Sequence, residues 1–136
     1  MTRETDIQDR YNSTLAPSSR IKVIIEIESG YYKIYKENDG SLIGTINMIS
    51  NFSNCGVLDL HCLSSPITHQ NISIILAVAH INCLLQGHSI MTYNTNNEQI
   101  PIRDALIKDG FKELSGFKNR SSGREIQFYA KQVWSG

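Results

Sequence analysis

The segment from Gln70 to Gln86 constrains the fold of this chain more than any other. It is apolar on nearly all sides, as expected of a helix buried against a sheet, and Gly87 is a suitable C-terminal cap. Strand-like segments lie on either side of it, VLDLHCL at 57–63 and HSIMTYN at 88–94. A strand, a helix and a strand in this order require a parallel, right-handed crossover. The sequence therefore predicts a central β-α-β unit.

The other segments surround this unit with hairpins. Asn38-Asp39-Gly40 is a strong hairpin turn between two strand patterns, and Pro101 opens a second helix that Gly110 closes. The second helix is expected at 102–109, and the remaining strands at 21–28, 31–38, 42–50, 111–114 and 124–132. Because hairpins join antiparallel strands, we predict an α+β fold with a mixed, mostly antiparallel sheet and two main helices.

Residues 1–20 are polar and show little periodicity, so we predict a flexible polar arm there. The rest of the chain, residues 21–136, is expected to form a single domain. A chain of 136 residues is long enough for one hydrophobic core and too short for two.

Charge and cysteine content exclude several classes of partner. Lys and Arg together number 13, as do Asp and Glu, so no strong basic field exists to bind nucleic acid. The three cysteines form no CxxC pair, which indicates free thiols in a reducing compartment. The apolar run 72–85 is too short to span a bilayer, and the N-terminus has no hydrophobic signal region. We therefore expect a cytoplasmic protein with no membrane contact.

The motifs over residues 31–132 resemble the GNAT superfamily of N-acetyltransferases. The resemblance includes the hairpin ENDGSLIGTI, the strand LDLHCL, the helix closed by Gly87 and the ALIKDGF pattern before the last strands. It implies a GNAT-like fold. The helices usually found between the first two strands are missing, because Ser29-Gly30 joins those strands directly.

The resemblance also implies where a cofactor would bind. In active members the turn after the fourth strand and the following helix read Arg/Gln-x-x-Gly-x-Gly/Ala, and helix N–H groups bind the pyrophosphate of acetyl-CoA. Here Gln70 matches the first position, Ser73 replaces the first glycine, and Ile75 adds bulk where a small residue is expected. If acetyl-CoA binds, the implied contacts are Leu63, Ser64, Gln70, Asn71 and Ser73.

The catalytic residues that the resemblance implies are altered. The tyrosine usually found four residues before Gly110-Phe111, often the acid that protonates the departing thiolate, is Leu106 here. Tyr93 on the strand 88–94 could replace it only if the geometry permits, and the alternative is an ordinary aromatic residue of a strand. Asp59 and His61 lie two residues apart on one strand, so both face one side. They are the candidate catalytic base of an enzyme, and the alternative is a polar strand face covered by a loop or a partner.

Two other groups of residues allow a functional and a structural interpretation. His80 and Cys83 lie one helical turn apart, which can suit a metal, but no second pair completes a site and core packing is favoured. The locally basic segment 118–124 could meet the 3′-phosphate of a coenzyme, and a solvated hairpin loop is the alternative.

The altered phosphate loop, Leu106 and the short N-terminal half favour a non-catalytic protein. We predict a degenerate GNAT-like scaffold with no cofactor, resembling antizymes or phage virion-associated proteins, which binds a protein partner or forms a homo-oligomer. If the chain is phage-encoded, it would be virion-associated. The alternative is an acetyl-CoA-dependent N-acetyltransferase with a divergent cofactor motif.

Overall fold

The computed structural model describes residues 2–13, 15–51, 56–64, 69–96, 100–118 and 125–134 of the chain. These residues form a seven-stranded sheet in the order β1-β2-β3-β4-β5-β7-β6. Only β4 and β5 pair in parallel, and every other pair is antiparallel. The strands are β1 (Ile21–Ile25), β2 (Tyr31–Lys36), β3 (Leu42–Asn51), β4 (Val57–Ser64), β5 (Ile90–Asn96), β6 (Lys112–Lys118) and β7 (Glu125–Gln132). The predicted α+β fold with a central β-α-β unit is confirmed.

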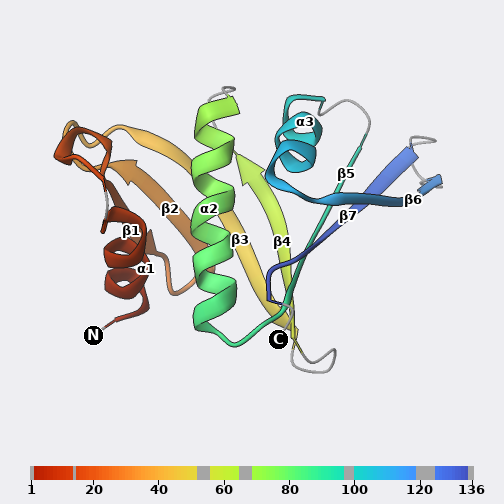
Figure 1. The fold of residues 1–136 in the computed structure, drawn as a ribbon, viewed down its shortest axis with the longest axis horizontal. Helices are drawn as coiled ribbons and strands as arrows, with labels where there is room; N and C mark the ends of the chain where they lie inside the picture. Colours follow the sequence, from red (N-terminus) through yellow and green to blue (C-terminus); the bar gives the residue numbers. More distant parts are fainter. Residues whose placement is uncertain are drawn as a thin grey trace.

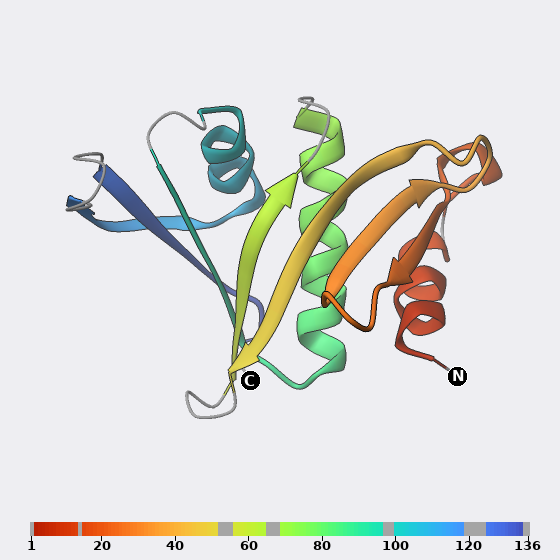
Figure 2. The same cartoon turned by 180° about the vertical axis from the view of Figure 1, so that it is seen from behind.

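The described helices lie on one face of the sheet. They are α1 (Arg3–Asn12), α2 (His69–Leu85) and α3 (Ile100–Asp109), with a short 3-10 helix, η1, at Pro17–Ser19. Figure 1 shows α2 between α1 and α3 in front of the strands, and Figure 2 shows the opposite sheet face with no described helix over it. The sheet therefore has one covered face and one open face.

Helix α2 is the centre of the core, as its apolar sequence predicts. The spacing of Ile72, Leu76, Ala79 and Cys83 at i, i+4, i+7 and i+11 predicts one buried stripe along the helix. The structure confirms it, since each of these side chains is at most 2% exposed. The helix ends at Gly87, which has a φ of +75°, and the His88 N–H group donates to the Cys83 carbonyl oxygen at 2.9 Å. A left-handed glycine followed by such a bond is a common helix ending.

The N-terminal segment differs from its prediction. A flexible arm was expected over residues 1–20, but residues 3–12 form α1 and Ile7 is fully buried. The side-chain amide of Asn12 donates to the Ile21 carbonyl oxygen and accepts from the Ile21 N–H group, both at 2.9 Å. Gln8 accepts from the Val23 N–H group at 2.6 Å. Because β1 is an edge strand, these amides satisfy backbone groups that would otherwise lack a partner.

Several boundaries also differ from the prediction. Strand β2 ends at Lys36, before the predicted 38, β5 covers Ile90–Asn96 where 88–94 was predicted, and α3 begins at Ile100 where 102 was predicted. Strand β1 ends at Ile25, because Glu26 begins the tight turn to β2. Strand β6 begins at Lys112 and runs to Lys118, beyond the predicted 111–114. Phe111 lies between α3 and β6 and caps the helix, since its N–H group donates to the Leu106 carbonyl oxygen at 3.0 Å.

Within the described ranges no helix is both long and apolar enough to cross a membrane. Nor do three or more His, Cys, Asp or Glu side chains gather there in a way that could hold a metal ion. His80 lies 3.4 Å from the Lys131 ammonium, and Cys83 is buried, which agrees with packing roles for this pair.

Candidate active site

The two parallel strands of the sheet separate at their carboxyl ends. Strands β4 and β5 pair from Val57–Ile90 to Leu60–Tyr93, and the pairing then stops although both strands continue. Figure 2 shows them diverging. We call residues 61–64 and 94–96, where the strands are unpaired with each other, the fork. The GNAT-like fold that the sequence resembles implies neighbouring parallel strands that diverge at their carboxyl ends, and this expectation is confirmed.

A bulge in β4 shapes one side of the fork. Against β3, Asn47 pairs with His61 but Thr45 pairs with Ser64, so β4 carries an extra residue there. Cys62 has a φ of +52° and is the one non-glycine residue with positive φ in the described chain. This backbone conformation costs roughly 1–2 kcal/mol for a residue with a Cβ. Such strain often occurs at functional sites, because it turns a backbone group toward a ligand.

Tyr93 of β5 reaches across the fork to this bulge. The Leu63 backbone N–H group is hydrogen-bonded to its hydroxyl oxygen, and the ring is 5% exposed. Burial raises the pKa of Tyr93 to about 12, although the Leu63 bond acts in the opposite direction. The phenol therefore stays protonated at neutral pH. The Leu63 N–H group thus donates to the phenol oxygen, and the protonated phenol has its own O–H group as a donor.

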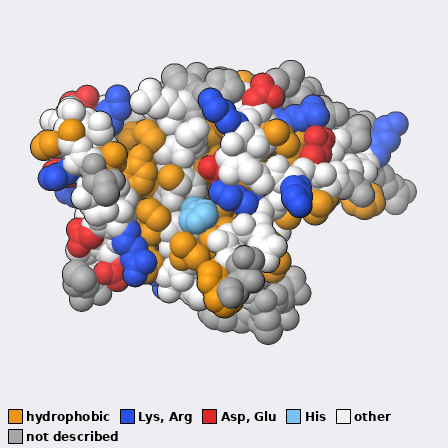
Figure 3. Space-filling model, in the orientation of Figure 1, with side chains coloured by type: hydrophobic (Ala, Val, Ile, Leu, Met, Phe, Trp, Pro, Cys, Tyr) orange, Lys and Arg blue, Asp and Glu red, His pale blue; other side chains and the backbone are white. Residues whose placement is uncertain are grey.

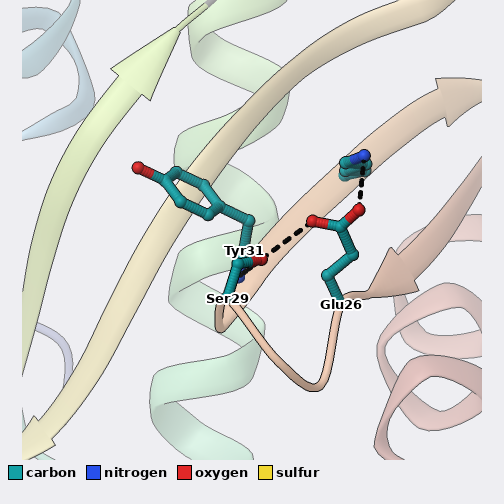
Figure 4. A network of polar contacts seen from close by, with 4 residues as sticks. Glu26, Ser29 and Tyr31 are labelled. Atoms are coloured by element: carbon teal, nitrogen blue, oxygen red, sulfur yellow. Dashed lines mark hydrogen bonds and ion pairs between the residues drawn. The ribbon is translucent and has the colours of Figure 1, made fainter.

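Tyr31 of β2 approaches the bulge from the open face. Its interaction with the Cys62 thiol raises the pKa of the phenol. Figure 4 shows the Tyr31 ring extending across β3, away from the turn that precedes it. In that turn the Glu26 carboxylate accepts bonds from Ser29 at 2.8 Å and from Lys33 at 2.7 Å. This network fixes the direct β1–β2 connection, which the sequence predicted at Ser29-Gly30.

The predicted base candidates also lie beside the fork. Asp59 and His61 are both half-buried and alternate with the core residues Leu58 and Leu60, which places them on the open face. The Thr92 hydroxyl donates to the Asp59 carboxylate across the β4–β5 pair. His61 is the last residue of β4 before the bulge, and the structure brings it nearer the fork than Asp59.

The predicted cofactor contacts are divided between two places. Leu63 and Ser64 form the end of β4, and only the Leu63 side chain is buried. Gln70 and Ser73 are exposed on the first turns of α2, with Asn71 half-buried between them. Ile75 was expected to add bulk at the cofactor motif. Its side chain is instead fully buried in the core. Its bulk fills the interior and does not stand on the exposed helix surface.

Two further predictions from the sequence concern Leu106 and the basic segment 118–124. Leu106 is fully buried in the core, so it takes no part in a site, as its apolar side chain suggested. Of the basic segment 118–124, only Lys118 belongs to the described residues.

Sequence reasoning missed Cys62, Tyr31 and the bond between Leu63 and Tyr93. No glycine marks the bulge, and the residues meet only because β2, β4 and β5 lie near one another in the sheet.

Comparisons with known proteins identify the architecture. Neither a protein-family model nor a curated protein sequence matches this chain. Solved structures do. A GNAT-family acetyltransferase from Bacillus anthracis is similar with a TM-score of 0.67 and 12% identity, over 79% of this chain and 69% of that one. The chain has the GNAT fold.

Two antibiotic acetyltransferases are similar as well. Aminoglycoside 6′-N-acetyltransferase from Enterococcus faecium has a TM-score of 0.62 and 13% identity, over 81% of this chain and 78% of its own. For nourseothricin acetyltransferase the TM-score is 0.64 and the identity 15%, over 76% of this chain and 64% of its own.

These comparisons correct the functional prediction from the sequence. Each of the eight similar structures that we compared is named as an acetyltransferase. None carries the name of an antizyme or of a phage virion protein. The prediction of a non-catalytic scaffold is therefore wrong, and the comparisons favour its alternative. The sequence-based inference of a non-catalytic scaffold relied on two altered motif residues, Leu106 and Ile75. The fork could not be considered, because it depends on how β4 and β5 pair.

Proposed function

We propose that this chain is an acetyl-CoA-dependent N-acetyltransferase. The observation that supports it most directly is the fork, where the Leu63 N–H group donates to a buried, protonated phenol that has its own O–H group as a donor. Acyl transfer builds negative charge on a carbonyl oxygen and on the departing sulfur. Fixed donors in a water-poor site stabilise such charge more effectively than water does.

The residues present suit an elongated acetyl donor. Tyr93 supplies a phenol O–H group next to the bulge, and Gln70 and Ser73 supply exposed polar side chains on the first turns of α2. The N-terminal N–H groups of a helix also favour phosphate. Acetyl-CoA would supply the acetyl group as a thioester, whose carbon bonds to the amine nitrogen while its bond to sulfur breaks.

Tyr93 acts in this proposal as a hydrogen-bond donor. Its pKa of about 12 lies well above the value of about 8.5 for a simple thiol, so full proton transfer from the phenol to a thiolate is unfavourable. Donation of a hydrogen bond needs no such transfer. The phenol, whose oxygen accepts from the Leu63 N–H group, can stabilise negative charge in the transition state, and the thiolate can take its final proton from solvent.

His61 is the candidate base on the acceptor side. Its imidazole lies on the open face next to the bulge, and it can take the proton that the acceptor's ammonium group must lose before the neutral amine attacks the thioester carbon. The Asp59 carboxylate already accepts a hydrogen bond from Thr92. We therefore assign Asp59 a role in positioning β4, the strand that carries His61. The acceptor would approach from the open face, opposite α2.

Calorimetry with acetyl-CoA, followed by assay of thiol release with a panel of amines, tests this proposal. The panel contains a lysine peptide, a polyamine and an aminoglycoside. We expect micromolar binding of acetyl-CoA and amine-dependent release of CoA. Tyr93→Phe should lower kcat by roughly 100-fold with KM for acetyl-CoA nearly unchanged, because a transition-state donor is lost.

Tyr129→Phe is the matched control. Tyr129 faces Tyr93 on β7 and is 1% exposed, so the same atom is removed from an equally buried site outside the fork. Its kcat should stay near that of the wild type. Binding of acetyl-CoA weaker than about millimolar would end the proposal, as would an equal loss of kcat in both variants.

A further inference from the structure

The strand register aligns a row of side chains across the open face, at the level of the fork. Tyr31 of β2 pairs with Asn47 of β3, and Asn47 pairs with His61 of β4. Beyond the fork, Asn94 of β5 pairs with Phe128 of β7. The last pair of β4 and β5 directly precedes His61 and Asn94, so these two residues lie opposite each other. Each of the five alternates along its strand with a buried neighbour, which places all of them on the open face. We call these five residues the open-face row.

An exposed aromatic pair forms one end of the open-face row. The rings of Phe128 and of Phe117 on β6 make an edge contact, with centroids 5.7 Å apart and an interplanar angle of 75°. The two side chains are 37% and 63% exposed, although phenylalanine is among the residues that folding most often buries. Two adjoining exposed rings beside a proposed site offer a surface that an apolar group of a ligand can cover.

The distance between His61 and this aromatic pair constrains the shape of such a ligand. Phe128 lies two strands away from His61, and neighbouring strands are roughly 4.8 Å apart, so the separation along the row is about 10 Å. An extended peptide advances about 3.3 Å per residue. A peptide with its amine at His61 therefore places the side chain of its third or fourth residue on the aromatic pair.

The charge of the open face disfavours a polycationic acceptor. Figure 3 shows Lys, Arg, Asp and Glu side chains spread over the helix-covered face. Among the described strand residues of the open face, the only carboxylate belongs to Asp59, and it accepts a hydrogen bond from Thr92. Lys22, Lys33 and Lys112 lie on the same face. The several charges of a polyamine or an aminoglycoside find few anionic partners there, so one ammonium group on an apolar body fits better.

The proposed base favours an α-amine over a lysine side chain. A model imidazole has a pKa of about 6.5, a peptide α-ammonium one of about 7.7–8.0 and a lysine ammonium one of about 10.4. Proton transfer to an imidazole is therefore much less unfavourable from an α-ammonium than from lysine.

We propose that the acceptor is the N-terminus of an extended peptide, and that Phe117 and Phe128 bind the apolar side chain of its third or fourth residue. This inference rests on the proposed acetyltransferase function and names the class of its acceptor. Asn94 is exposed between the base and the aromatic pair, where its amide can bond to the peptide backbone. The open face thereby continues the fork as a surface that binds the substrate.

The test measures acetylation of two short peptides by the purified full chain with acetyl-CoA. The peptides differ only at their third and fourth positions, which are leucine in one and serine in the other. We expect kcat/KM to be roughly tenfold to hundredfold higher for the leucine peptide. The difference should lie mainly in KM, because the apolar contact is present before and during the reaction. Phe117→Ser/Phe128→Ser should lower the value for the leucine peptide to near that for the serine peptide.

Ile24→Ser/Leu42→Ser is the matched control. Both side chains are apolar and belong to the sheet, with exposures of 37% and 45%, and neither is part of the open-face row. This variant should keep the wild-type preference for the leucine peptide. Thermal melting of each variant checks its fold. If the double phenylalanine variant melts early, Phe117→Ser alone, at the more exposed ring, still carries the test.

A third peptide identifies the reacting amine. It keeps the leucine residues but has a blocked N-terminus and a lysine in the first position. We expect its kcat/KM to be lower by about tenfold or more, because the lysine proton is harder to remove. Equal values for the blocked and unblocked peptides would refute the α-amine assignment, as would faster turnover of a polyamine or an aminoglycoside than of the leucine peptide.

The outcomes separate this inference from the proposed function. Amine-dependent release of CoA with equal kcat/KM for the leucine and serine peptides would overturn the peptide assignment and leave acetyl transfer standing. Acetyl-CoA binding weaker than about millimolar would overturn both. Gel filtration covers the remaining occupant of this face, a second copy of the chain. A wild-type dimer that the double phenylalanine variant separates, with the peptide preference unchanged, would also overturn the assignment.

Discussion

Helices α1 and α2 lie next to each other on the same face of the sheet, but they are attached to it by different side chains. Helix α2 presents apolar residues all round and buries Ile72, Ile75, Leu76, Val78 and Ala79. Helix α1 buries only Ile7 completely. It is held largely by the amides of Asn12 and Gln8, which bond to the backbone of β1.

This difference shows two ways to dock a helix. Burial of apolar surface is non-directional and scales with area, so α2 can be recognised from its composition alone. Hydrogen bonds to a strand edge depend on geometry, and each contributes only about 1 kcal/mol net. We therefore expect α2 to carry the stability of the domain and α1 to be a separable, weaker attachment.

The largest expected effect comes from a charge in the α2 contact. Leu76 is fully buried, and an unpaired carboxylate there costs several kcal/mol, comparable to the whole stability of about 5–15 kcal/mol for a small domain. Leu76→Asp should therefore fail to fold, as measured by circular dichroism and gel filtration. Leu84→Asp, at a residue of the same helix that is 40% exposed, should melt cooperatively. A folded Leu76→Asp protein would refute the central role of α2.

An intermediate effect is expected from the α1 contact. Asn12→Ala removes both bonds to Ile21 and should lower stability by about 1–2 kcal/mol. Hydrogen exchange should speed up at α1 amides while α2 amides stay protected. Asp9→Ala, at an exposed position of α1, is the control and should change neither. Unchanged exchange in α1 of the Asn12 variant would show that apolar contacts hold the helix instead.

The smallest effect concerns the polar contact between His80 of α2 and Lys131 of β7. Burial, and then the nearby Lys131 ammonium, lower the pKa of His80, with Asp109 opposing them. The folded state thus binds fewer protons than the unfolded state, whose histidine titrates near 6.5. Stability should fall as the pH drops below that value, and His80→Gln should flatten this dependence.

Titration of the His80 ring by NMR checks the same point directly. A pKa at or above about 6.5 would contradict the assigned cause. Lys131→Met should raise the His80 pKa, because it removes the neighbouring positive charge.

Much of the fold could be predicted because its signals are local. The apolar α2, the glycine that ends it and the strand patterns on either side lie within about forty consecutive residues, and their order implies the crossover. The same local information located Asp59 and His61 on one strand face. It also placed Gln70 and Ser73 at the start of the helix, where the structure exposes them.

Only the tertiary structure decided how α1 docks, where β4 bulges and which residue Tyr93 contacts, because each of these features joins residues that are far apart in the chain. The side-chain amide of Asn12 bonds to the backbone of the edge strand β1. The polar sequence of residues 1–20 contains no pattern that predicts this contact. The bulge at Cys62 arises from the β3–β4 register, and no glycine in the sequence predicts it. Tyr93 faces the Leu63 N–H group because β4 and β5 separate just beyond their last paired residues. Side-chain periodicity reports which residues are buried, but the meeting of two specific donors depends on how the strands pair.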